Sequence, residues 1–436
     1  MALGGGSFTM QNKELPGTYI NFVSAASASA VLSERGIATM PLELDWGREG
    51  EVFEVTGEDF RKDSMKMFGY AFESPQLKGL RDLFMGARKL CAYRLNGGGE
   101  KAGNSLATAL YSGKRGNDLK IVILENADDP QRFDVMTYLG TTRVDLQTVG
   151  TAAELAANDY VTFKPGAELV ATAGAPLTGG TNGSVSGAAH QAYLNKVESY
   201  TFNTMGVVVT DETTKKLYAA FARRLRDEMG VKFQLVLYQA GFADYMGVIS
   251  VKNRVLDEGC SEASLVYWVT GAECGCAVNK SCQNRAYEGN YAVDTDYTQD
   301  QLKQAVKDGE FVLHKVNADV RVLEDVNSMV TTTDTCGEVF KDNQAIRVMD
   351  QLGNDDAVLF NTKYLGIVPN NAAGRTSLWS DLVKVRQRLQ DLGAIENFTD
   401  SDVEVVQGDN KKTAVVTSAV EISGTMGKLY MTVTVA

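Results

Sequence analysis

The chain has 436 residues, of which 44% are hydrophobic and 22% charged, so its core can be large without support from disulfides or a metal. It carries 43 basic and 55 acidic side chains, a formal net charge of −12. This balance argues against nucleic acid as a partner, because phosphate neutralisation needs clustered Lys and Arg. With no run of about 18 apolar residues and no secretory signal pattern, we expect no membrane insertion by this chain. At roughly 100–200 residues per domain, the length predicts about three domains.

The first segment, residues 1–29, is interpreted as an N-terminal arm or linker. A Gly-rich start precedes an extended stretch over residues 18–24. The bulky residues with which this stretch could pair with another strand are Tyr19, Ile20, Phe22 and Val23.

The next region, residues 30–95, has a mixed pattern. Short strands are predicted at 40–44 and 51–55, and Ser74 leads into a helix with one apolar stripe. The residues of that stripe are Leu77, Leu80, Leu83 and Phe84. The Gly-rich run at 96–99 marks the end of this region.

Residues 96–178 are rich in strands with turn signals between them, which predicts a small β-sandwich. The expected strands cover residues 119–124, 133–138, 144–149 and 160–163. A second Gly-rich run, residues 174–187, closes the region, and we interpret both runs as linkers rather than phosphate-binding loops because neither has the spacing of a nucleotide-binding motif.

From residue 179 to 335 the pattern alternates between strands and helices, which predicts an α/β domain with a mainly parallel sheet. Helices are expected at 188–199, from Asp211, after Ser261 and after a capping box that begins at Thr298. The expected strands are 206–209, 233–238, 248–251 and a hairpin formed by 311–316 with 320–326.

Residues 336–427 predict a C-terminal α+β domain. Two helices, at 340–364 and 377–392, precede strands at 403–406 and 413–422. The second helix has an apolar stripe with Lys384 and Arg388 on one flank and Arg386 on the other. These cations form either a solvated helix flank or a positive ridge that docks on an acidic partner.

The last segment, residues 428–436, alternates between apolar and polar side chains, as a half-buried β-strand does. Its apolar positions are Leu429, Met431, Val433 and Val435. No later residue can cover the outer edge of this strand, so we expect it to add to the sheet of a neighbouring chain as a C-terminal arm. The alternative is an ordinary strand within the chain's own sheet.

The sequence offers little catalytic chemistry. Its two histidines, His190 and His314, are expected to be structural, and no motif of a hydrolase or metalloprotease is present. Cys274, Cys276 and Cys282 have the wrong spacing for structural zinc and are expected to be small buried thiols. We therefore predict no catalytic residue, no cofactor and no metal. A hydrolase-like enzyme on the α/β domain and a redox protein using these cysteines are the alternatives.

Six segments in order give the chain a resemblance that spans almost its whole length. They are L-P-G-x-Y-I-N-F at 15–22, R-G-x-A-x-M-P-L-x-L-x-W-G at 35–47, Y-R-L-N-G-G at 93–98, Y-S-G-K-R-G-N-D-L-K-I at 111–121, P-L-T-G-G-T-N-G at 176–183 and A-E-C-G-C-A-V-N-K-S at 272–281. Together they resemble the tail sheath proteins of contractile-tailed bacteriophages and the related phage-tail-like bacteriocins. The cysteines in the last segment depart from the family pattern, which usually has small residues other than cysteine there.

The resemblance implies a fold and a role. It implies a β-sandwich over 96–178, a domain with a subtilisin-like fold but no hydrolase activity over 179–335, and a C-terminal domain over 336–427 with which residues 30–95 pack. Copies of the chain would form a helical sleeve around an inner tube, with both arms adding strands to neighbouring subunits. The sleeve would contract from a metastable extended state and drive the tube through a cell envelope.

The resemblance also implies partners and sites. The partners would be further copies of the chain, the inner tube protein, and baseplate and tail terminator proteins. Lys384, Arg386 and Arg388 would face the tube, and hinges would lie at 4–7, 24–29 and 423–427. The protein would be made in the cytoplasm of a bacterial host, assembled into a virion or a phage-tail-like particle, and released on lysis.

Overall fold

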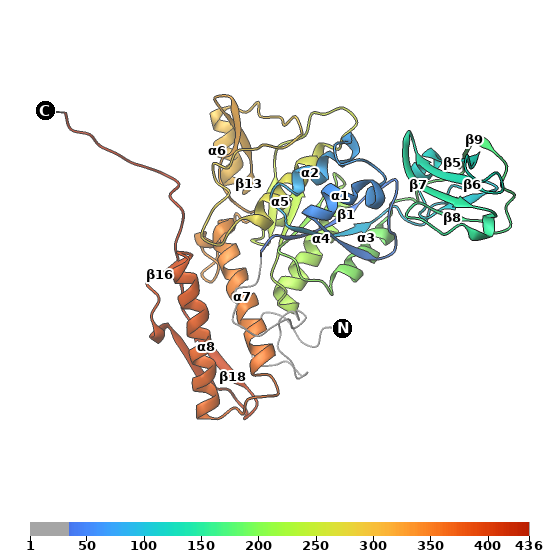
Figure 1. The fold of residues 1–436 in the computed structure, drawn as a ribbon. Coiled ribbons are helices and arrows are strands. Elements are labelled where there is room, and N and C mark those ends of the chain that lie inside the picture. The colour runs from blue at the N-terminus through green and yellow to red at the C-terminus, as the bar shows by residue number, and fades with distance from the viewer. Residues whose placement is uncertain (1–34, 436) are drawn as a thin grey trace. The chain divides into compact units, whose positions relative to one another are not determined.

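The computed structural model describes residues 35–435, and Figure 1 shows their helices and strands. The described chain falls into two compact units. We call residues 40–78 and 89–198 the sandwich unit, and residues 35–39, 79–88 and 199–435 the sheet unit. Within residues 35–435, every helix is too short or too polar to cross a membrane.

Two antiparallel sheets enclose the core of the sandwich unit. Their strands are β4 (Ala107–Ala109), β5 (Leu119–Glu125), β6 (Phe133–Leu139), β7 (Thr142–Val149), β8 (Val161–Phe163) and β9 (Thr172–Pro176). One sheet has the order β7-β6-β5-β9, and the other pairs β4 with β8. Inward-facing residues of both sheets, among them Ile121, Val135 and Val161, form one buried cluster with Trp46. This two-layered core confirms the predicted β-sandwich.

The sandwich unit also contains the end of β1 (Ile37–Leu42), the antiparallel pair β2 (Val52–Thr56) and β3 (Lys89–Arg94), and the helices α1 (Gly57–Phe68) and α3 (Gly187–Val197). The sequence pattern predicts neither α1 nor β3. Only Phe60, Ser64 and Phe68 of α1 are buried, a narrow stripe on a mostly polar helix. In β3 the last five residues are all buried, so no alternation marks the strand.

The two Gly-rich runs, 96–99 and 174–187, cross closely within the sandwich unit, where a backbone hydrogen bond of 3.0 Å joins them. A Cβ atom on Gly99 would lie only 1.9 Å from the carbonyl oxygen of Thr181. The glycines are needed here because two backbones approach too closely for any side chain.

A parallel sheet lies at the centre of the sheet unit. Its strands are β1, β10 (Thr204–Val207), β11 (Gln234–Tyr238), β12 (Val248–Val251) and β13 (Glu310–Phe311). They follow the order β13-β12-β11-β10-β1, with parallel pairing throughout. Helix α4 (Glu212–Arg223) packs on β11, and α5 (Leu265–Gly275) packs on β10, β11 and β12. The predicted mixed α/β architecture is confirmed, and every residue of β10, β11 and β12 is buried, as in a sheet covered on both faces.

Smaller elements of the sheet unit also follow the sequence pattern. They are α2 (Lys78–Leu83), α6 (Gln299–Lys307), β14 (Leu313–Val316) and β15 (Asp319–Val322). Thr298 and Gln301 form the expected capping box at the start of α6. Strands β14 and β15 pair as the expected antiparallel hairpin.

The C-terminal part of the sheet unit is built on two long helices (Figure 1). Its elements are α7 (Asn343–Lys363), α8 (Ala372–Asp391), β16 (Ile395–Glu396), β17 (Val403–Gln407), β18 (Ala414–Ser418) and β19 (Glu421–Ile422). Helix α8 packs against α7 and against β17, which pairs with β18. It begins at Ala372 rather than at 377 because the Asn371 side chain caps it by accepting a hydrogen bond from Gly374 N.

Candidate functional site

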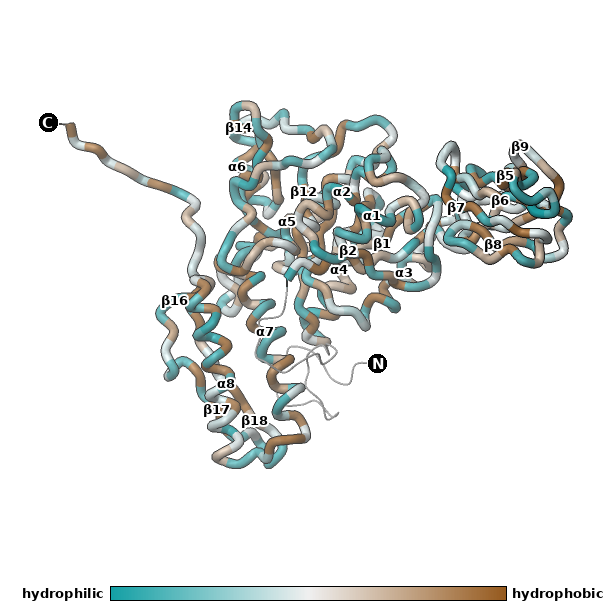
Figure 2. Tube along the Cα trace, viewed as in Figure 1, coloured by the Kyte–Doolittle hydropathy of each residue, from teal (hydrophilic) through white to brown (hydrophobic). Residues whose placement is uncertain are grey.

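The C-terminal tail, residues 426–435, leaves the sheet unit as an uncovered segment (Figure 1). Figure 2 shows hydrophobic residues along it. The exposed fractions of its predicted pairing residues are 84% for Leu429, 74% for Met431, 68% for Val433 and 88% for Val435. In the described chain the tail forms no β-strand, in contrast to the predicted strand at 428–435. A strand needs a hydrogen-bonded neighbour, so pairing of this tail stays a prediction.

The tail is fixed to the folded chain through Gln344 in the first turn of α7. The amide nitrogen of Gln344 donates to Ser423 O at 3.0 Å, and its amide oxygen accepts from Thr425 N at 3.1 Å. Gln344 is buried, and these bonds end inside the predicted hinge 423–427. The predicted hinges 4–7 and 24–29 lie outside the described residues, as do the N-terminal pairing residues Tyr19, Ile20, Phe22 and Val23.

The three cations predicted to face the tube lie in different surroundings on α8. Arg386 is only 2% exposed and forms a two-bond ion pair with Asp356 of α7, with Nη2 to Oδ2 at 2.7 Å. Lys384 is exposed and lies 3.0 Å from Asp381, and Arg388 is partly exposed. Because Arg386 joins two helices inside the fold, its side chain does not fit an exposed contact. Lys384 and Arg388 remain the candidates on this helix.

The two histidines occupy ordinary positions. His190 is buried in α3, and His314 is partly exposed in β14, where burial lowers the pKa of its imidazole. His314 lines a cavity of about 630 Å³ that also includes Ser281. The hydroxyl of Ser281 donates to Asp325 at 3.0 Å. This serine is therefore engaged by a carboxylate, and the geometry gives no nucleophile activated by a histidine in this cavity.

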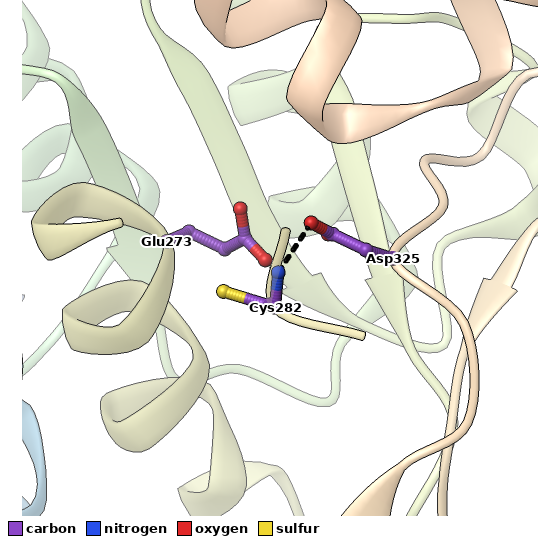
Figure 3. Close-up of side chains that lie close together, drawn as sticks. All are labelled: Glu273, Cys282 and Asp325. Atoms are coloured by element: carbon purple, nitrogen blue, oxygen red, sulfur yellow. Dashed lines mark hydrogen bonds between the residues drawn. The ribbon is translucent and has the colours of Figure 1, made fainter. Parts of the chain in front are cut away.

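Glu273 of α5, Cys282 and Asp325 come together in the sheet unit (Figure 3), with their ligand atoms within 4.8 Å of one another. All three are buried. Arg347 of α7, also buried, donates to both carboxyl groups, at 2.8 Å in the case of Asp325. The guanidinium supplies the positive charge beside both carboxyl groups. We interpret the four residues as a buried ionic joint, and we use the name Arg347 joint for this cluster.

The two carboxyl groups of the Arg347 joint differ in protonation. Burial raises the pKa of Glu273 well above its ordinary value, and the charge of Asp325 raises it further. Burial also acts to raise the pKa of Asp325, but Arg347 and the hydrogen bonds that Asp325 accepts lower it to about 2. Glu273 therefore holds a proton more readily than Asp325, which stays ionised beside Arg347. The single negative charge of Asp325 then balances Arg347.

A further buried ion pair fixes α7. Asp350 accepts two hydrogen bonds of 2.7 Å from Arg226, which lies in the π-helical turn Arg224–Met229 that continues α4. Together with the Arg347 joint and the pair of Arg386 with Asp356, this contact ties α7 to α4, α5 and α8.

The sequence pattern does not predict these ion pairs. Their partners are up to 124 residues apart along the chain, and a charged residue in a helix is normally expected to face water. The first turns of α7 are buried on all sides, from Asn343 to Val348, so polar side chains there must find partners inside the protein.

Comparisons with known proteins agree on one family. Family models match the Gp18 domain III N-terminal region of tail sheath proteins at 35–95, the phage tail sheath β-sandwich domain at 86–182, the central domain at 183–328 and the C-terminal domain at 335–436. The crystal structure of a sheath tail protein from Desulfitobacterium hafniense is 36% identical, with a TM-score of 0.80 over 93% of this chain and 100% of that chain. The chain belongs to the phage tail sheath protein family.

Other relatives of this sheath protein extend the similarity. The phage-like element PBSX protein XkdK of Bacillus subtilis is 32% identical over 99% of this chain and 100% of its own length. The contracted helical sheath of the anti-feeding prophage is 14% identical with a TM-score of 0.54 over 97% of this chain and 99% of that chain, which shows a shared fold.

Membership in this family confirms the predicted role. The protein is a structural subunit of a contractile tail sheath. The alternative of a hydrolase-like enzyme finds no support in a family of structural sheath proteins.

Proposed function

We propose that copies of this sheath protein exchange strands, so that the C-terminal tail of one subunit adds to a sheet of its neighbour. The observation that supports this proposal is the exposure of the apolar side chains of the tail. Leu429, Met431, Val433 and Val435 repeat every second residue and are between 68% and 88% exposed. Contiguous apolar surface of this kind normally marks an interaction site. Main-chain hydrogen bonds and alternate side chains are what strand addition uses.

The N-terminal arm is proposed to do the same through Tyr19, Ile20, Phe22 and Val23. Strand-exchanged arms keep subunits linked while the compact units move, which a sleeve requires if it is to contract from a metastable extended state without falling apart. Contraction would then drive an inner tube through a cell envelope.

The contact with the inner tube protein is proposed to include Lys384 and Arg388. Lys384 is exposed and already pairs with Asp381 of its own helix. Each ion pair between such an exposed side chain and the tube protein therefore contributes only about 0–1 kcal/mol. A helical sleeve repeats the contact at every subunit, and many weak contacts together then bind the sleeve to the tube.

The remaining parts of the proposal concern the setting of the protein. The α/β region 179–335 is proposed to have a subtilisin-like fold without catalysis, and the chain is not an enzyme. Baseplate and tail terminator proteins are the further partners. The protein is made in the cytoplasm of a bacterial host and leaves on lysis, as part of a virion or of a headless bacteriocin particle.

Assembly of truncated protein tests strand exchange. We compare the full chain with one that ends at Gly427, one that lacks residues 1–24, and a control with Thr432→Ser and Thr434→Ser on the polar face of the tail. Circular dichroism should show folded protein in all four cases, and electron microscopy should show long sleeves only for the full chain and the control. Normal sleeves from either truncated chain would refute strand exchange by that arm.

The same assay with tube protein tests the cations of α8. Charge reversal at Lys384 and Arg388 should lower the fraction of extended, tube-filled particles. An unchanged fraction would remove these residues from the tube contact and leave strand exchange untouched.

A further inference from the structure

Arg94, the last residue of β3, is a buried cation at the root of the β-sandwich. It is only 1% exposed. Its Nη1 donates to Gly47 O at 3.1 Å and to Ser112 O at 2.9 Å. Its Nε donates to Asn96 Oδ1 at 3.3 Å. One guanidinium thus joins three separate segments of the sandwich unit.

Charge pairing does not explain why Arg94 is buried. Its Nη2 is buried without a hydrogen-bond partner in the described part of the chain. Burial lowers the pKa of Arg94, and the charges of Glu49 and Asp45 act in the opposite direction without a direct ion pair. A buried cation without such a pair costs free energy. In return, a charged donor forms strong hydrogen bonds, and here two of them hold main-chain carbonyl groups.

Glycines let the backbones meet around this guanidinium. A Cβ atom on Gly113 would lie 2.0 Å from Asp45 O, and one on Gly183 would lie 2.0 Å from Gly97 O. Gly113 also has a φ of +130°, which side chains rarely allow. We use the name Arg94 crossing for the segments that meet in this way, which are 45–49, 94–100, 111–115 and 180–183.

Side chains add further hydrogen bonds between the segments of the Arg94 crossing. Glu49 Oε2 accepts from Gly98 N and from Ser112 Oγ, both at 2.8 Å. Asn182 Nδ2 donates to Asp45 Oδ1 at 2.6 Å. All four segments are therefore bonded to one another although no sheet or helix holds them together.

The Arg94 crossing lies where the β-sandwich joins the rest of the sandwich unit. The chain enters the sandwich after β3 and leaves it after β9, before α3 begins. Trp46, beside the crossing, belongs to the buried core of the sandwich. Four of the six segments that carry the family resemblance meet here, namely 35–47, 93–98, 111–121 and 176–183. The sheath role described so far gives these segments no task.

We propose that Arg94 is a positioning residue that locks the β-sandwich to strands β2 and β3, so that they turn as one body. The two passages of chain into and out of the sandwich, 95–101 and 179–186, contain no helix or strand that could stiffen them. In a contractile sheath, a locked sandwich follows every rotation of these strands. The lock acts within one subunit, so it does not depend on the proposed exchange of strands between copies.

Hydrogen exchange of the full-length subunit tests the lock. Mass spectrometry follows deuterium uptake in wild type, Arg94→Met and Arg94→Lys. Arg94→Met removes all three hydrogen bonds of the guanidinium and should speed exchange in the Arg94 crossing about tenfold, because local opening becomes easier. Peptides of β5 and β6 should keep their wild-type rates. Arg94→Lys retains the charge without the forked donor and should give intermediate rates. The amides that report on the crossing are those of Gly98, Lys114, Thr181 and Gly183.

Two matched controls separate the lock from general effects of substitution. Arg132 is an exposed arginine of the same unit that donates to one carbonyl, Thr148 O, and Arg132→Met should leave the crossing at wild-type rates. Gly113→Ala should speed exchange in the crossing with Arg94 intact, because its Cβ would meet Asp45 O. Gly166→Ala, whose Cβ would have no atom within 4 Å, should not.

Two results would overturn the proposal. The first is wild-type exchange in the crossing of Arg94→Met. The second is equal acceleration in β5 and β6, because Arg94 would then support the whole sandwich rather than its attachment. If Arg94→Met does not fold, Arg94→Lys and Gly113→Ala provide the same comparison, and wild-type rates in both would overturn the lock.

Discussion

Helix α7 buries charged side chains, whereas the C-terminal tail exposes apolar side chains. α7 buries Arg347, Asp350 and most of its first two turns, and ion pairs tie it to α4, α5 and α8. The tail of the same unit leaves Leu429 and Val435 more than four-fifths exposed. Charged groups lie inside the protein, whereas apolar groups lie in water.

Proteins usually bury apolar groups and expose charged ones, and the two regions that depart from this pattern differ in what they contribute. Buried ion pairs are a weak source of net stability, but they demand one exact arrangement of their partners. An uncovered apolar tail adds little to the stability of its own subunit and is free to serve the strand exchange proposed above. The contrast agrees with the proposed strand exchange, in which the tail serves contacts between subunits.

The largest effect is expected for Arg347→Met. The change leaves the ionised Asp325 buried without its cation, and breaking such a pair costs about 3–5 kcal/mol. Urea unfolding of the sheath protein should show a loss of this size. A loss below about 1 kcal/mol would mean that the Arg347 joint is not what fixes α7.

A smaller effect is expected for the ion pair between α7 and α8. Arg386→Met should lower the free energy of unfolding by about 2–3 kcal/mol, because Asp356 loses a two-bond partner in a mostly buried position. Lys384→Met, two residues away on the exposed flank, is the matched control and should cost about 0–1 kcal/mol. Equal losses for both variants would contradict the buried position of Arg386.

The pH dependence of stability should report both carboxyl groups of the Arg347 joint. The pKa of Asp325 falls to about 2 on folding, so its contribution is present above pH 4 and is lost as the pH falls toward 2. The loss amounts to roughly 2 kcal/mol. Glu273 has the opposite sign. Its folded pKa is raised, so its contribution is present at acid pH and is lost as the pH rises through the folded value.

Two substitutions separate these contributions in urea unfolding measured across the pH range. Asp325→Asn should flatten the fall in stability between pH 4 and 2. Glu273→Gln, which mimics the protonated acid, should flatten the fall in stability that begins as the pH rises above the ordinary Glu pKa of 4.5, and should leave the protein more stable than wild type at pH 7. An acid slope unchanged in Asp325→Asn would show that another carboxylate causes it.

The smallest effect on subunit stability is expected in the tail. Met431→Ser with Val433→Ser should change the free energy of unfolding of the isolated subunit by less than about 0.5 kcal/mol, because both side chains are already in water. The same protein should fail to build long sleeves. A clear loss of subunit stability would show that the tail packs on its own body and would remove the contrast with α7.

Periodicity was enough to predict most long elements. The alternation in 144–149 and the capping box at Thr298 depend only on neighbours in the sequence, and β7 and α6 lie where these signals place them. The family resemblance added the order of domains and the sheath role, which no local pattern contains.

Interactions between distant segments could not be predicted from the sequence. Gly99 looks like part of a linker, yet a second backbone 1.9 Å from its missing Cβ is the reason for the glycine. Arg386 looks like an exposed helix cation because its partner Asp356 belongs to another helix. Glycine suits both a flexible linker and a close contact between two backbones, and arginine suits both an exposed helix face and a buried ion pair. Only the tertiary contact shows which of the two applies.

The attachment of the tail to Gln344 has a mechanical consequence. Two hydrogen bonds to one buried amide join the base of the tail to the first turn of α7. Tension from a neighbouring subunit would enter the body at this amide and reach Arg347 one helical turn away. Under the proposed strand exchange, the load path from subunit to subunit would run through an uncharged, buried side chain of the subunit's own body.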